Sequence, residues 1–166
     1  MDDGHCHVIG RTMPVIDGVL VVPAWIGPAK HYVPSKGRAY TFGLFAVSSD
    51  TLAFLSSDLT LEWPKDEVNI TWPRLQGGAG CWLEWPDGKY AICFGKPFPN
   101  APSPDADLLG GAAEALDTVS NLPIGLDDLL TGTGILGNLL GLAASIRDIK
   151  AGRGTAQDVK AALLPV

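Results

Sequence analysis

Short apolar runs in the first hundred residues are separated by polar turn signals at intervals of about 8 to 12 residues, a spacing typical of an all-β sandwich or barrel. The runs are rich in Val, Phe, Trp and Tyr. In one run, Tyr40, Phe42 and Leu44 share a face by the two-residue period of a strand. The pattern predicts strands over residues 17–26, 39–47, 52–55, 59–63, 68–72, 81–85 and 89–94.

The last two predicted strands form a hairpin. They flank the turn sequence Pro86-Asp87-Gly88, in which proline fixes φ for a type I turn and glycine accepts the left-handed position that follows. The glycine cluster "QGGAG" at 76–80 precedes this hairpin. A phosphate-binding loop requires a helix after its glycines and usually a Lys-Ser or Lys-Thr pair, whereas "CWLEW" reads as a strand. We therefore interpret the cluster as a connection between strands or a bulge.

The composition changes between Pro97 and Pro104, where four of eight positions are proline. Aromatic residues disappear after this segment, and Leu, Ala and Gly dominate. The apolar spacing predicts a helix from Asp105, a candidate N-cap, to Ser120. A longer helix is expected over 126–151 and a short one over 155–164, with Thr155 and Asp158 at capping-box spacing.

An uncharged segment from Leu129 to Ile146 is the most informative feature of the carboxy-terminal part. Small residues recur in it every four positions, which places them on one ridge of a helix where another helix can approach closely. These residues are Thr133, Gly137, Gly141 and Ser145. The segment is only moderately apolar, so packing within the protein or between copies is favoured, with membrane attachment as the alternative.

Charge and cysteine content restrict the classes of partner. The 166-residue chain has a formal net charge of −6, which argues against nucleic-acid binding because phosphate-rich partners require a clustered positive surface. Three cysteines without CxxC spacing indicate neither a disulfide framework nor a zinc site. The cysteine content favours a reducing cytoplasm, and the acidic amino-terminal sequence does not resemble a secretory signal. A cytoplasmic location is therefore expected, with membrane association as the alternative.

Few residues are available for catalysis or metal binding. Of the three histidines, His5 and His7 flank Cys6 near the amino terminus, and adjacent residues rarely reach one metal ion in tetrahedral geometry without further ligands. A catalytic triad that depends on histidine is disfavoured, because only three histidines are present and two of them lie near the amino terminus. The sequence predicts no catalytic residue, no metal site and no cofactor.

The stretches "GLFAVSSDTLAFL", "WPKDEVNITW" and the "DGK" hairpin ending in "YAICF" resemble the PH-like superfamily, particularly GRAM and bacterial PH-like domains. The resemblance covers about residues 15 to 120. In this family a strand enters a polar turn and the chain leaves the turn through a Leu-x-Phe sequence, a pattern that corresponds here to Val47–Phe54. It implies an α+β fold in which a PH-like antiparallel β-barrel is followed by a helical extension. We assign 1–14 to a flexible tail, 15–100 to the barrel and 101–166 to the extension, whose first helix is the candidate to close the barrel.

Two groups of residues are candidates for binding. Lys30, Lys36 and Arg38 lie between the first two predicted strands and resemble the cations with which some PH domains bind phosphoinositides, although a solvated loop is the favoured interpretation. The second group consists of three tryptophans that belong either to the core or to a partner surface: Trp72, Trp82 and Trp85. The regular alternation of a strand places Trp82 and Trp85 on opposite faces.

These features together predict a non-enzymatic interaction or adaptor module. It is expected to recognise a protein partner through the barrel and to self-associate through the helices. Two alternatives stay open: a peripheral membrane protein that binds anionic lipid, and a structural subunit of an assembly.

Overall fold

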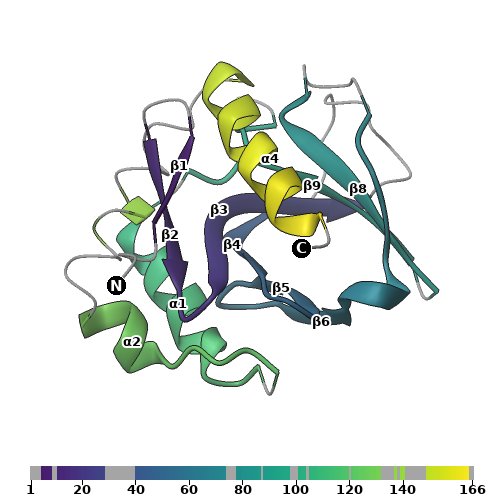
Figure 1. Ribbon diagram of the computed structural model, residues 1–166. Coiled ribbons are helices and arrows are strands. Elements are labelled where there is room, and N and C mark those ends of the chain that lie inside the picture. The colour runs from purple at the N-terminus through teal and green to yellow at the C-terminus, as the bar shows by residue number, and fades with distance from the viewer. Residues whose placement is uncertain are drawn as a thin grey trace.

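Figure 1 shows the computed structural model, an α+β protein built on a strongly curved antiparallel sheet. The structure describes residues 5–8, 11–28, 40–73, 78–86, 88–97, 101–103, 105–119, 121–131, 137, 139–140 and 149–164. The strands are β1 (His5–Val8), β2 (Arg11–Ile16), β3 (Val19–Pro28), β4 (Thr41–Val47), β5 (Thr51–Leu55), β6 (Thr60–Pro64), β7 (Asn69–Thr71), β8 (Gly80–Trp85) and β9 (Gly88–Cys93). The helices are α1 (Ala106–Leu116), α2 (Leu126–Thr131) and α4 (Ile149–Leu163), and a 3-10 turn, η2 (Lys65–Glu67), follows β6.

The strands follow the order β6-β5-β4-β3-β9-β8-β7, with β2 pairing with β3 and β1 pairing with β2. The predicted hairpin is present as β8 and β9, with Trp85 opposite Gly88. Among the described strands no pairing joins β6 to β7, so the sheet curves but stays open at that seam. The predicted α+β class is confirmed, in the form of an open antiparallel sheet with helices.

Strand β3 is the centre of the sheet and bends sharply (Figure 1). Along one edge it pairs with β4 from Leu20 to Ile26. Along the other edge its first residues pair with β2, and its last residues, from Trp25 onward, pair with β9. Along this second edge, Pro23 lies in the stretch of β3 after the residues that pair with β2 and before those that pair with β9. Proline has no backbone N–H, and at this position neither β2 nor β9 loses a hydrogen bond because of it.

The concave face of the sheet, which we call the inner face, holds an aromatic core. Trp63 of β6 and Tyr90 of β9 are far apart in strand order, yet their ring centroids are 5.7 Å apart. Phe45 and Phe94 also meet there, at 6.0 Å. Contacts between strands that are not neighbours require the sheet to wrap around these side chains.

Helix α1 covers the opposite, outer face of the sheet, where it packs against β4 and β5. The Asp105 side chain accepts a hydrogen bond of 2.8 Å from the Leu108 N–H, as expected of an N-cap. The proline-rich segment before the helix is held by Trp25, whose Nε1–H donates to the Pro102 carbonyl at 2.8 Å. This bond fixes where the chain leaves the sheet and enters α1.

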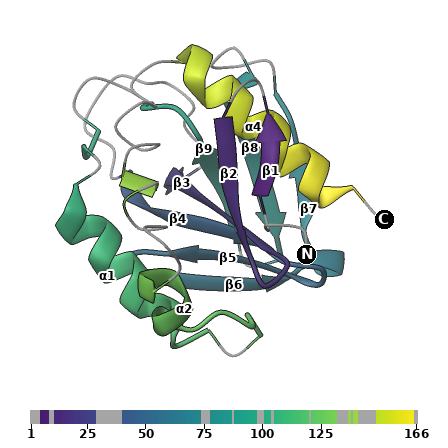
Figure 2. The same ribbon diagram turned by 60° about the vertical axis from the view of Figure 1, so that its left-hand side comes forward.

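Helix α4 lies on the other side of the sheet from α1 and α2 (Figure 2). It contacts β1, β3, β4 and β8, and it buries Thr155, Ala156 and Val159. The sequence nominated the first helix to close the curved sheet, but α4 covers the inner side. The reason is that α1 is tied to the outer face by the Trp25–Pro102 bond and by its packing on β4 and β5.

Two sequence-based boundaries differ from the structure. Residues 5–8 and 11–14, assigned to a flexible tail, belong to the β1–β2 ribbon, in which β2 continues to Ile16. Within the helix expected over 126–151, all the described residues are helical: α2 (Leu126–Thr131), residues 137 and 139–140, and the start of α4 at Ile149. Because α4 begins six residues before Thr155, that residue lies inside the helix and Thr155 and Asp158 do not form a capping box.

The glycines of α4 yield a prediction about stability. A Cβ added at Gly152 would lie 2.7 Å from the Gly95 backbone nitrogen, whereas a Cβ at Gly154 meets nothing within 4 Å. We expect Gly152→Ala to lower the free energy of unfolding by about 1–3 kcal/mol, because backbone atoms cannot move aside. Gly154→Ala should raise it by up to about 1 kcal/mol through helix propensity. Urea unfolding of both variants measures the difference, and equal effects would contradict the close contact between α4 and the sheet.

Candidate functional site

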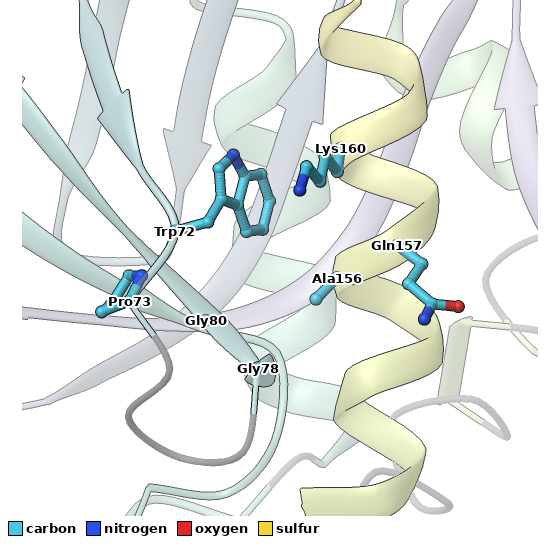
Figure 3. Close-up of a pocket in the computed structure, with 7 residues that line it drawn as sticks. All are labelled: Trp72, Pro73, Gly78, Gly80, Ala156, Gln157 and Lys160. Carbon is cyan, nitrogen blue, oxygen red and sulfur yellow. The ribbon is translucent and has the colours of Figure 1, made fainter.

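Helix α4 separates two cavities, and the two cavities form the candidate functional region. The first, which we call the Trp72 groove, has a volume of about 430 Å³ and lies between α4 and the segments that flank β7 and β8 (Figure 3). Its described lining consists of Trp72, Pro73, Gly78, Gly80, Ala156, Gln157 and Lys160. The second, which we call the Asp158 cavity, has a volume of about 670 Å³.

Trp72 and Lys160 face each other across the first of these cavities (Figure 3). Trp72 follows β7 and is half-buried, whereas Lys160 is exposed on α4. The Lys160 ammonium lies 5.9 Å from the centroid of the Trp72 ring, within the range of a cation–π contact. Within the described part of the chain, Lys160 has no carboxylate partner. The groove thus offers an aromatic surface beside a cation that is able to bind an anion.

The other two predicted tryptophans have different surroundings. Trp82 pairs with Ala91 and Trp85 with Gly88, so the two tryptophans point to opposite faces, as the alternation predicts. Lys89 lies over the Trp82 ring at 4.5 Å on the outer face. Trp85 is half-buried against the core of the sheet. Trp72 alone of the three lines a cavity described here.

The other predicted sites fall largely outside the described residues. This holds for Lys30, Lys36 and Arg38 and, on the helical ridge, for Thr133, Gly141 and Ser145. Gly137 is described: it is helical and exposed, and a Cβ there would have no neighbour within 4 Å among the described residues. The roles proposed for these residues stay predictions.

The glycine cluster leads into a strand, as expected. Gly78 has a φ of 84°, which glycine adopts without steric cost, and Gly80 begins β8. No helix begins directly after the cluster, so its backbone amides lack the helix N-terminus that phosphate loops use.

The Asp158 cavity lies on the opposite flank of α4, where Leu20 and Val47 of the inner face form part of its wall. The described lining is Val15, Gly18, Leu20, Val47, Ser48, Ser49, Lys65, Asp158, Ala161, Ala162 and Leu164. Asp158 is 3% exposed, and its Oδ1 is buried without a hydrogen-bond partner among the described residues. Burial raises the pKa of this carboxyl to about 6, because the charged form loses its hydration.

Lys65 borders the same cavity but does not neutralise Asp158. Its ammonium donates to the Ala162 carbonyl at 3.3 Å and to the Ser48 carbonyl at 3.5 Å. The first contact places a cation at the carbonyl end of α4, where the helix dipole favours positive charge. Lys65 therefore ties η2 to the end of α4, and the carboxylate of Asp158 is left without an ion pair within the described structure.

Sequence reasoning missed Lys65, Asp158 and Lys160. One signal was available for Asp158: it lies three residues before Ala161 and four before Ala162, so these apolar residues are its neighbours along the helix surface. A carboxylate on an apolar helix face indicates either an unrecognised partner or a cavity. The position of Lys65 could not be found in this way, because its contacts are with residues 17 and 97 positions away.

The described residues offer little for nucleophilic catalysis, metal binding or membrane insertion. Burial raises the pKa of the Cys81 thiol far above its ordinary value, and the nearby Cys93 raises it further, so Cys81 is a poor nucleophile. No group of three or more His, Cys, Asp or Glu residues is arranged to hold a metal ion in the part of the chain that the structure describes. Within the same residues, no helix has the length and apolar character needed to cross a membrane.

Comparisons with known proteins do not assign the chain to a family. No protein-family model matches the sequence, no curated protein matches it, and no solved structure matches its fold.

The buried carboxyl yields a prediction about pH dependence. The folded-state pKa of Asp158 is raised to about 6 from 3.8, so protonation favours folding. Its contribution to stability is complete below pH 4 and is lost as the pH rises through 6. We expect Asp158→Asn to raise the free energy of unfolding at pH 7.5, on the order of 1 kcal/mol, and to change it little at pH 4.

Urea unfolding of the wild type and of Asp158→Asn at the two pH values measures this difference. Asp66→Asn is the matched control, because Asp66 is exposed in η2. The prediction is wrong if Asp158→Asn has the same effect at both pH values.

Proposed function

We propose that the chain is a non-enzymatic interaction module with a PH-like curved sheet, and that it recognises a protein partner through the Trp72 groove. One observation carries the proposal: a half-buried tryptophan and a lysine without a carboxylate partner face each other across a groove. Tryptophan is enriched among the residues that dominate binding energy at protein interfaces. The groove is bounded by α4 on one side and by segments next to β7 and β8 on the other.

The chemistry of the groove favours an extended segment that carries a carboxylate beside an apolar residue. Lys160 would bind the carboxylate, and the face of Trp72 would pack against the apolar side chain. The chain as a whole is acidic, with a net charge of −6. At physiological salt, however, charges more than about 8 Å apart are largely screened, so the local lysine decides which charge the groove attracts.

The proposal retains self-association through the helical extension. Gly137 is an exposed helical glycine with open space around its Cβ position, so a second helix could approach the backbone there. The resemblance to the PH-like superfamily supports the same view, since many such domains bind proteins.

Binding can be tested with an array of octapeptides in which Asp or Glu is next to Leu or Pro. We expect the wild-type chain to bind a subset of these peptides. Trp72→Ala should weaken that binding by at least about tenfold, because it removes the aromatic surface. Lys160→Glu should abolish binding of the acidic peptides and allow binding of their lysine-substituted counterparts.

Trp82→Ala is the matched control, because Trp82 lies on the outer face of the sheet and should leave peptide binding unchanged. Equal binding by the wild type, Trp72→Ala and Lys160→Glu would overturn the proposal. Flotation with anionic vesicles by a chain that binds no peptide would favour the membrane alternative.

A further inference from the structure

We propose that the Asp158 cavity is a second binding site, and that it takes a small primary amine with an apolar body. This site is separate from the Trp72 groove, because the two lie on opposite flanks of α4 and share no described lining residue. The inference therefore stands or falls independently of the proposed function.

The buried carboxylate determines the head group of the ligand. Asp158 is 3% exposed, and its Oδ1 accepts no hydrogen bond from the described residues. A buried polar atom without a partner is costly and is rare in folded proteins. At neutral pH the carboxylate is largely ionised, because its pKa is raised only to about 6. A cationic donor therefore satisfies it better than a neutral one does.

The walls of the cavity determine the body of the ligand. Val15, Leu20, Val47 and Leu164 surround the space, and Leu164 is 62% exposed. A volume of about 670 Å³ lies within the range of roughly 300–1,000 Å³ that is usual for small-molecule sites. An aliphatic or aryl chain in this space would cover both the apolar wall and the exposed leucine.

Lys65 is the other ionisable side chain in the described lining. Its ammonium is held on the Ser48 and Ala162 carbonyls, so it does not form an ion pair with Asp158 in the described structure. Ser48 is also occupied, because its hydroxyl bonds to Asp50 and to the Thr51 backbone. Ser49 is an exposed neutral hydroxyl of the lining, so Asp158 is the charged acceptor of the described lining that is able to accept a new donor.

The test is a titration of the full chain with n-hexylamine, n-hexanol and hexanoate at pH 7.5, followed by amide chemical shifts in ¹⁵N-labelled protein. We expect n-hexylamine to shift the resonances of Leu20, Val47 and Ala161. It should bind at least about tenfold more tightly than n-hexanol, because the neutral alcohol donates a hydrogen bond to the carboxylate without the positive charge that strengthens the ammonium bond. Hexanoate should cause no shift at these residues.

Asp158→Asn is the decisive variant, since it keeps the size of the side chain and is expected to fold at least as stably as the wild type. It should bind n-hexylamine at least about tenfold more weakly. Trp72→Ala should bind it as the wild type does, which separates this site from the groove. The proposal is overturned if n-hexylamine does not shift these residues, if n-hexanol binds equally well, or if Asp158→Asn binds with wild-type affinity.

Discussion

The position of β3 is the constraint on which the rest of the structure depends. Its backbone pairs with β4 along one edge and with both β2 and β9 along the other, and nine of its ten residues are buried. A strand buried on both faces requires cover on both sides of the sheet. Helix α1 supplies it on the outer face, and the curved sheet together with α4 supplies it on the inner face. The bend of β3 allows one strand to serve both halves of the sheet (Figure 1).

The placement of α4 explains why two cavities lie beside one helix. The helix buries Ala156 and Val159 toward the sheet, and Gly152 allows its backbone to approach Gly95 closely. The side chains on its two flanks then face spaces that the sheet does not fill, with Lys160 on one side and Asp158 on the other. A ligand on either flank would contact the same helix through different side chains.

Much of the strand pattern was predictable because it depends on neighbours in sequence. The alternation of apolar residues located β3 to β9, and the Pro-Asp-Gly turn set the pairing of β8 with β9. The Asp105 cap located the start of α1. The β1–β2 ribbon was missed, because its segment lacks the apolar alternation that marked the other strands. Where α4 begins was missed because a capping-box pattern at Thr155 lies within the helix.

The sequence by itself determined the α+β class, the positions of most strands along the chain, the hairpin and the N-cap of α1, since these follow from side-chain period and turn chemistry over a few residues. The tertiary structure decided which helix covers the inner face, which tryptophan lines a groove, and that Asp158 is buried beside a cavity. These outcomes depend on contacts between distant segments, such as Lys65 with Ala162 and Trp25 with Pro102. Local sequence patterns carry no information on such contacts. The contacts form only when the curved sheet brings the distant segments together.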